Sequence, residues 1–500
     1  MKKRSVGRTL ATVAGALMGA AVIADAPAQA APDLNQASVP ELQARMADGS
    51  VTSVALVQAY LKRIDALDRR GPRLNSIIAL NPHALADARA LDAERRSGHL
   101  RGPLHGVPVL IKDNIESDDG TATTAGSLAL KDNVTGRDAP VVRRLTDAGA
   151  VILGKTNLSE WANYRSTRSI SGWSAVGGLV RNPYGLDRTA CGSSAGTGAA
   201  VAAGLAAAGV GTETDGSIIC PAAMNGLVGL KPTVGLVSRT FIIPISASQD
   251  TAGPMTRTVS DAAALLTAMA GTDPADPATA DADRHRTDYL KALDPEALKG
   301  ARLGVLRITE GRSPAADALF REAMTRLQAA GAVLVEVKTP DLEPIGAAEQ
   351  VVLSTEFKAG LNAYLASTSP ERVKTRTLED VIAFNDAEPQ ETVLFGQEIF
   401  KASQATAGLQ DPAYLKAREA ARRLAGPEGI DRLLKENDLV ALIAWSGPAG
   451  VTDPVNGSRS FGPPTTLSAV SGYPHLTVPM GYVSGLPVGL SFMGDRKSVV

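Results

Sequence analysis

Short apolar runs alternate with helical stretches from residue 103 onward, and this alternation most constrains the fold. Each run has the length of a strand and is followed by a polar turn and a segment with helical character. Strands that are apolar along their whole length indicate a sheet covered by helices on both faces. The sequence therefore predicts an α/β fold, and the clearest strands are residues 107–111, 151–153, 303–306, 333–337, 439–444, 476–478 and 488–492.

Sequence patterns typical of helices lie before and between these strands. Ser38 and Glu41 form a capping-box pattern, and a second helix is expected from about Thr52, so the chain should begin with a helical arm. Residues 195–211 are almost entirely Ala, Gly and Val, which predicts a buried central helix. Residues 340–430 read as a more polar helical insertion. Because no repeat or linker interrupts the pattern, we expect a single large domain.

The first thirty residues have the composition of an export signal. Basic residues precede an apolar run at positions 10–23, and Ala28-Gln29-Ala30 follows as a small-residue cleavage site. An uncleaved anchor is the alternative, but the run is short of the about 20 residues that a membrane span needs. We therefore expect a signal peptide at 1–30 and a periplasmic or secreted protein with no stable membrane association. The basic residues are Lys2, Lys3, Arg4 and Arg8.

Charge and the scarce residue types exclude several functions. The net charge of −1 offers no basic field, so we expect no nucleic-acid partner. The five histidines lack the spacing of metal ligands, and we expect neither a metal nor a cofactor. Two cysteines exclude a disulfide framework. Cys191 and Cys220 either pair with each other or remain buried free thiols, and the sequence leaves both open.

Lys112 is the first candidate for chemistry. It follows directly on a fully apolar strand, where little water is available to solvate its charge. Burial disfavours an ammonium group and lowers its pKa, which makes such a lysine a candidate base. A lysine that simply reaches solvent is the other interpretation of this segment.

Two serine-bearing loops flank the predicted buried helix. Ser193 and Ser194 lie in a loop of small residues at its start, and Ser217 follows Gly216 beyond its end. Glycine beside serine at a helix start leaves backbone amides free to bind an anion, and free amides in a turn suit an oxyanion. Serine and glycine are also ordinary capping and turn residues.

Taken together, these segments resemble the amidase signature family. The resemblance rests on residues 106–114, 154–160, 191–196, 212–217 and 229–233, and extends over about residues 38–494. It implies a single α/β domain whose central mixed sheet is covered by helices on both faces, over residues 31–494. Within the family, the chain is most similar to bacterial peptide amidases, which release ammonia from the C-terminal carboxamide of peptides. This similarity is carried by residues 159–163, 212–217 and 249–255.

The resemblance implies roles for individual residues. Ser217 matches the nucleophile, Ser193 the bridging serine with an unusual cis peptide bond, and Lys112 the base. Ser194 matches a supporting hydroxyl. The backbone amides that form the oxyanion hole belong to Thr214, Asp215, Gly216 and Ser217. The expected reaction is hydrolysis of a carboxamide through an acyl-enzyme.

Three positions depart from the family pattern. Asp215 stands where many members have glycine, and it either accepts a hydrogen bond from the substrate NH2 or serves as a buried structural acceptor. Ile219 replaces a frequent arginine, so we expect neutral carboxamides to be preferred. Residues 495–500 resemble nothing in the family, and a missing helix there would leave apolar sheet surface uncovered.

Parts of the sequence also match other functions. Residues 192–196 also match the nucleophile elbow of α/β-hydrolases, with Ser194 as nucleophile and His285 or His475 as base, but the required apolar strand does not precede them. An amidotransferase subunit acting on charged transfer RNA would contradict the export signal. A broader aliphatic or aryl amidase or esterase, and a non-catalytic periplasmic binder, are the remaining alternatives.

Overall fold

The structure is a computed structural model and describes residues 35–448, 450 and 464–498. These residues belong to one compact unit that begins at Leu34. The predicted signal peptide at 1–30 lies outside the described residues. Its boundary, the 31–494 domain and the distinct tail at 495–500 therefore stay predictions.

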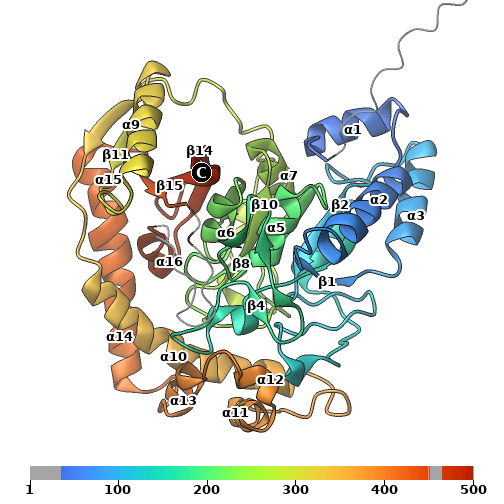
Figure 1. Ribbon diagram of the computed structural model, residues 1–500. Helices are drawn as coiled ribbons and strands as arrows, with labels where there is room; N and C mark the ends of the chain where they lie inside the picture. Colours follow the sequence, from blue (N-terminus) through green and yellow to red (C-terminus); the bar gives the residue numbers. More distant parts are fainter. Residues whose placement is uncertain (1–34, 449, 451–463, 499–500) are drawn as a thin grey trace, which may run out of the picture. The chain divides into compact units, whose positions relative to one another are not determined.

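A mixed sheet of eleven strands forms the centre of the described unit (Figure 1). Its strand order is β1-β3-β2-β8-β10-β9-β14-β15-β13-β11-β12. Parallel pairing joins β2 to β3 and β8 on one side of the sheet, and β11 to β12 and β13 on the other. The strands are β1 (Ile77–Leu80), β2 (Pro108–Lys112), β3 (Val151–Thr156), β8 (Ala208–Glu213), β9 (Val228–Lys231), β10 (Thr251–Thr256), β11 (Arg302–Val305), β12 (Val333–Glu336), β13 (Ala441–Ser446), β14 (His475–Val483) and β15 (Leu486–Met493).

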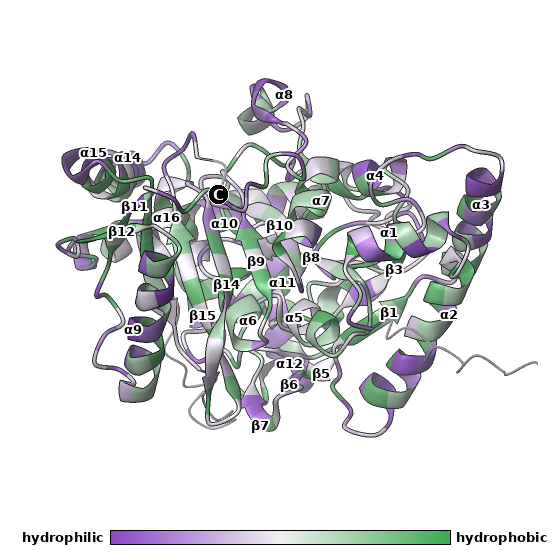
Figure 2. Cartoon of the chain, turned by 90° about the horizontal axis from the view of Figure 1, so that it is seen from above, coloured by the Kyte–Doolittle hydropathy of each residue, from purple (hydrophilic) through white to green (hydrophobic). Residues whose placement is uncertain are grey.

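Helices flank this sheet on both faces, which confirms the predicted α/β class. Figure 2 shows α7 on one side of the central strands and α5 and α6 on the other. The capping box at Ser38 and Glu41 is present at the start of the N-terminal arm. The helices are α1 (Val39–Ala47), α2 (Ser53–Arg63), α3 (Ala84–Arg96), α4 (Pro140–Asp147), α5 (Ala195–Ala202), α6 (Ile219–Met224), α7 (Val259–Met269), α8 (Ala282–His285), α9 (Pro314–Ala329), α10 (Glu343–Ala366), α11 (Leu378–Ala387), α12 (Pro389–Thr392), α13 (Glu398–Gln404), α14 (Pro412–Ala425), α15 (Arg432–Asn437) and α16 (Thr466–Ser471).

The predicted buried helix at 195–211 is wrong in its second half. Helix α5 ends at Ala202, and the chain returns as strand β8 between β2 and β10. Glycines on β8 explain both the wrong helix prediction and the close packing of α5 on this strand. A Cβ at Gly209 would lie 2.5 Å from Thr197 Cγ2 on α5, and one at Gly211 would lie 2.8 Å from Ser194 Oγ. The glycines that made this segment look like helix in fact let α5 lie directly on the strand.

A disulfide bond joins Cys191, in the loop before α5, to Cys220 in α6, and so decides between the two alternatives that the sequence left open. Both side chains are buried. The bond therefore fastens the segment that carries Ser193 to the helix that follows Ser217. Among the described residues, no helix combines the length and the apolar character that crossing a membrane requires.

Replacing both cysteines by serine should lower the free energy of unfolding by about 2–4 kcal/mol, because the bond closes a loop of 29 residues in the unfolded chain. Urea unfolding of the oxidised chain and of the double-serine variant measures the difference. A reducing agent should shift the unfolding of the parent chain toward that of the variant and leave the variant unchanged. Coincident unfolding curves of the oxidised chain and the variant would contradict a stabilising role.

Candidate active site

Three segments that carry the predicted site residues meet at one edge of the sheet. Lys112 is the last residue of β2, and Thr212 lies near the end of the adjacent strand β8. Because β2 and β8 run parallel, their carboxyl ends lie at the same edge. The loop that carries Ser193 enters α5, which packs on β8, and the turn with Ser217 leaves β8.

Lys112 is fully buried and hydrogen-bonded at its head group. Its Nζ lies 2.7 Å from Ser193 Oγ, 2.9 Å from Thr212 Oγ1 and 3.3 Å from Thr212 O. The amide of Asn114 also donates to Thr212 Oγ1, at 3.0 Å. The lysine therefore points inward at Ser193, and the interpretation that it reaches solvent is wrong.

The environment of Lys112 brings its protonation equilibrium close to neutral pH. Burial lowers the pKa of Lys112 to about 7, and the nearby charges of Asp250 and Glu213 oppose this shift. An unprotonated lysine amine retains a lone pair that accepts a proton. At neutral pH a substantial fraction of Lys112 is therefore in the form that a base requires.

The loop before α5 is held tightly around Ser193. The peptide bond between Gly192 and Ser193 is cis, as the family resemblance implied. Ser193 O accepts a hydrogen bond from Ser159 N at 2.9 Å, and a Cβ at position 192 would overlap Ser159 Oγ. Only glycine therefore fits before Ser193 in this arrangement.

Ser194 connects the same loop to strand β8. Its Oγ donates to Thr212 O at 3.1 Å and accepts from Thr212 N at 3.2 Å. Both hydrogen bonds go to the residue that also holds Lys112 Nζ. The structure thus gives Ser194 two hydrogen bonds that join its loop to β8, and its supporting role stays a prediction.

The turn around Ser217 presents unpaired backbone amides. Among the described residues, the N–H groups of Thr214, Asp215, Gly216 and Ser217 donate to no acceptor. The next two amides are different, because Ile218 N and Ile219 N donate to Glu213 Oε2 at 2.7 and 2.9 Å. Buried amides without partners are uncommon in folded proteins. Four successive amides that donate to none of the described residues, beside a serine, are an arrangement that can bind negative charge.

Ser217 itself is placed beside the serine loop but is not hydrogen-bonded to it through its side chain. Ser217 O accepts from Ser194 N at 3.2 Å, whereas the Ser217 hydroxyl makes no hydrogen bond to the described residues. The structure therefore joins Lys112 to Ser193 directly and brings Ser217 next to them. Catalytic hydrogen bonds are often long in enzymes without substrate and shorten in the complex.

Several polar residues around this turn were not assigned roles from the sequence. Asp250 Oδ1 accepts from Thr214 Oγ1 at 2.6 Å, and Gln249 Nε2 donates to Thr214 O at 3.3 Å. Gln249 also donates to Glu349 Oε1 on α10, at 2.8 Å. Gln249 and Asp250 lay in a family-like segment, whereas nothing in the local sequence of Glu349 points to the site.

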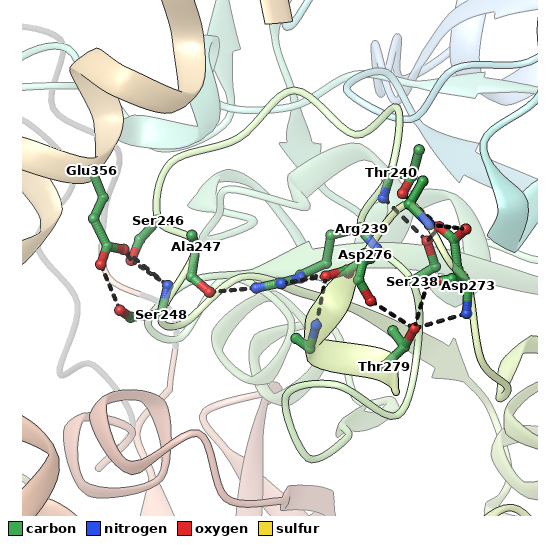
Figure 3. Close-up of polar contacts among 12 residues, drawn as sticks. Ser238, Arg239, Thr240, Ser246, Ala247, Ser248, Asp273, Asp276, Thr279 and Glu356 are labelled. Atoms are coloured by element: carbon green, nitrogen blue, oxygen red, sulfur yellow. Dashed lines mark hydrogen bonds and ion pairs between the residues drawn. The ribbon is translucent and has the colours of Figure 1, made fainter. Parts of the chain in front are cut away.

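A cavity of about 730 Å³ opens beside Asn114, Thr212 and Thr214, and its walls include residues 242–248 and α10. Figure 3 shows how the wall loop is anchored. Ser246 and Ser248 donate to Glu356, and Arg239 forms an ion pair with Asp276. Hydrogen bonds and an ion pair thus hold the side chains that shape the cavity, which borders the residues around Lys112. Further hydrogen bonds in this network join Ser238 and Thr240 to Asp273, and Arg239 to Ala247 O.

The side-chain hydrogen bonds of Ser194 in the described residues go to Thr212 and not to either histidine of the α/β-hydrolase alternative. His475 Nδ1 lies 2.9 Å from Ser468 Oγ, and burial lowers the pKa of His475 to about 3. His285 lies in the short helix α8. In the described part of the chain, no three His, Cys, Asp or Glu side chains gather in the manner of a metal site.

The sequence matches the Amidase family over residues 55–498. A protein of Arabidopsis thaliana named "Probable amidase" is 40% identical over 480 residues, which cover 93% of this chain and 88% of that protein. The crystal structure of native peptide amidase from Stenotrophomonas maltophilia is 55% identical, with a TM-score of 0.86 over 92% of this chain and 94% of that one. A peptide amidase in complex with the competitive inhibitor chymostatin is 55% identical, with a TM-score of 0.89 over 92% and 95% of the two chains.

The family match and the peptide amidase structures that the chain resembles define it as an amide-hydrolysing enzyme. The chain belongs to the amidase family. Its fold, a single α/β domain with a large mixed sheet, is the fold of the amidase structures that it resembles.

Proposed function

We propose that this enzyme hydrolyses carboxamides through a relay of Lys112, Ser193 and Ser217, and that its substrates are C-terminal amides of peptides or amino acids. The observation that carries the relay is the 2.7 Å contact between Lys112 Nζ and Ser193 Oγ beside the free amides at Ser217. Neutral Lys112 takes a proton from Ser193, Ser193 takes one from Ser217, and Ser217 Oγ attacks the amide carbon.

The free amides next to Ser217 support the remaining steps. They stabilise the negative oxygen that forms when Ser217 adds to the carbonyl carbon. Ser193 then returns a proton to the leaving nitrogen, so that ammonia departs and an acyl-enzyme remains. Water attacks the acyl carbon in the same way and releases the carboxylic acid. Each proton that leaves the nucleophile is thus transferred to the leaving group.

The choice of peptide amides rests on similarity. The two peptide amidase structures share 55% of their residues with this chain over nearly its whole length. The inhibitor chymostatin occupies one of these relatives. A competitive inhibitor bound by a peptide amidase supports a peptide or small-molecule amide as the substrate here.

Ammonia release from blocked dipeptide amides tests this proposal. The purified chain should hydrolyse them, and Ser217→Ala should reduce kcat by about 10⁴-fold or more, because the covalent step is lost. Ser193→Ala should cost about as much, since residues of one relay act as a unit. Thr325→Ala, which removes an exposed hydroxyl on α9, serves as a folded control. Turnover of aliphatic or aryl amides but not of peptide amides would support the proposed relay and contradict the proposed peptide-amide substrate.

The pH dependence of kcat/KM should rise through pH 7, where Lys112 loses its proton. Asp250 favours the charged form of Lys112, so Asp250→Asn should lower the pKa of Lys112 and move this limb to lower pH. Because no hydrogen bond joins the two side chains, we expect a shift on the order of half a pH unit. Asn keeps an acceptor for Ile245 N and Ser246 N and a partner for Thr214, so the fold should be retained. A limb that stays in place or moves to higher pH would contradict the assignment of Lys112 as the base.

We also propose that the enzyme is exported with cleavage after Ala30. The basic and apolar pattern of residues 1–30 supports export. The disulfide between Cys191 and Cys220 agrees with it, because such bonds persist in oxidising compartments.

Expression in a Gram-negative host followed by fractionation tests the export proposal. The active enzyme should appear in the periplasm or medium, and its N-terminal sequence should begin at Ala31. A variant lacking residues 2–23 should remain in the cytoplasm. Recovery of the full chain with an intact N-terminus in the cytoplasm would overturn the proposal.

A further inference from the structure

Asp215 places a carboxyl group in the middle of the unpaired amides. It lies directly before Gly216, and its Oδ2 accepts a hydrogen bond from Thr466 Oγ1 at 3.2 Å. Its Oδ1 has no hydrogen-bond partner among the described residues. The residue is partly exposed, whereas its neighbour Thr214 and Ser217 are each only 8% exposed. Thr465 and Glu349 also lie within hydrogen-bond reach of the Asp215 carboxyl group, whose two oxygens together can accept about four hydrogen bonds, so capacity remains for a ligand beside Ser217.

Glu349 on α10 determines the charge of this group. Burial, followed by the charge of Asp215, raises the pKa of Glu349 to about 8. Gln249 Nε2 holds Glu349 Oε1 at 2.8 Å, so the two carboxyl groups cannot separate freely. Burial raises the pKa of Asp215 as well, but hydrogen bonds from Thr465 and Thr466 and the charge of Lys231 oppose that rise, so Glu349 is the member of the pair that holds a proton more readily.

The remaining charges around the turn leave it with an excess of negative charge. Lys231 faces both Glu213 and Asp215, and burial lowers the pKa of this lysine to about 8. Two carboxyl groups thus share one lysine, and burial raises the pKa of Glu213 against the charge of that lysine. His475 is neutral in this range because burial lowers its pKa to about 3. Lys112, on the other side of β8, has a pKa of about 7 and does not offset the excess fully.

This excess matters because the reaction changes the charge of the ligand. The substrate is a neutral carboxamide with two N–H donors, and the products at neutral pH are a carboxylate and ammonium. The four free amides that stabilise the reacting oxygen would also attract the carboxylate of the product. Without an opposing charge, the product would remain bound where the next substrate must enter.

We propose that Asp215 is the specificity-determining residue that admits the neutral carboxamide, as a hydrogen-bond acceptor for its NH2, and expels the product carboxylate by charge repulsion. This inference rests on the proposed hydrolysis at Ser217. It requires no step beyond that reaction, since Asp215 gains and loses no proton during turnover. It also favours the first of the two roles that the sequence left open for Asp215.

Product inhibition by the free peptide acid tests the inference. For each protein, the Ki of the acid is compared with the KM of the matching amide, and the ratio of Ki to KM is the readout. Asp215→Asn removes the charge and keeps the shape, so the ratio should fall on the order of tenfold. Glu349→Gln replaces a group that already carries a proton, so its ratio should stay within about twofold of the parent value. The ratio of the parent chain should rise above pH 8, where Glu349 ionises, and that of Glu349→Gln should not.

A ratio unchanged by Asp215→Asn would overturn the inference and leave Asp215 a structural acceptor. If that variant hydrolyses nothing, calorimetric binding of the acid to Ser217→Ala and to the Ser217→Ala/Asp215→Asn double variant gives the same comparison without turnover. Tighter binding to the double variant supports the inference, and equal binding overturns it. If peptide amides prove not to be substrates, the ratio is measured with whichever amide is hydrolysed and its acid. Failure of the proposed substrate is then distinguished from failure of the role of Asp215.

Discussion

The site depends on the hydrogen bond between Lys112 Nζ and Ser193 Oγ, which lies where no water reaches the lysine. A buried amine needs partners for its protons, and Thr212 supplies two further acceptors from the neighbouring strand. Those contacts require β8 to lie next to β2 and α5 to lie directly on β8. Gly209 and Gly211 make that approach possible, because a side chain at either position would overlap α5 or Ser194. The small residues of this region thus allow the side-chain amine of Lys112 to reach its hydrogen-bond partners.

The same strand separates two different electrostatic environments. On one side, burial brings the pKa of Lys112 to about 7, with Asp250 and Glu213 favouring the charged form. On the other side, the charges of Glu213 and Asp215 favour the charged form of Lys231, and burial lowers its pKa to about 8. Lys231 faces carboxylates at the turn, whereas Lys112 contacts only hydroxyls and a carbonyl. A lysine that acts as a base must give up its proton easily, and the contacts of Lys112 suit that requirement better.

Local sequence patterns predicted those parts of the molecule whose structure is decided locally. The apolar run that ends at Lys112 indicated both the strand and the buried amine, and the glycine-serine loop indicated the segment of Ser193. Strand β8 was missed because its glycines resemble the preceding helix, and only pairing with β2 and β10 makes it a strand. The pairing of Cys191 with Cys220 also depends on how the helices return over the sheet. Glu349 reaches the turn from a helix more than a hundred residues away in the chain, so no local sequence pattern predicts its position at the site.

Two residues near Ser217 depart from the family pattern, Ile219 and Asp215. Both departures make the turn better suited to a neutral ligand than to an anion. Ile219 replaces a cation that many family members carry, and the carboxyl group of Glu213 is satisfied only in part: its Oε2 accepts from two backbone amides, whereas its Oε1 has no hydrogen-bond partner among the described residues. Ile219 is itself fully buried, so no charged group fits there without displacing the packing. Asp215 then adds a second carboxylate to a turn that has one lysine. A neutral amide enters this turn without changing the charge, whereas an acid would bring a third negative group. Under the proposed role of Asp215, the absence of a cation at 219 and the carboxyl group at 215 act together to favour neutral carboxamides over acids.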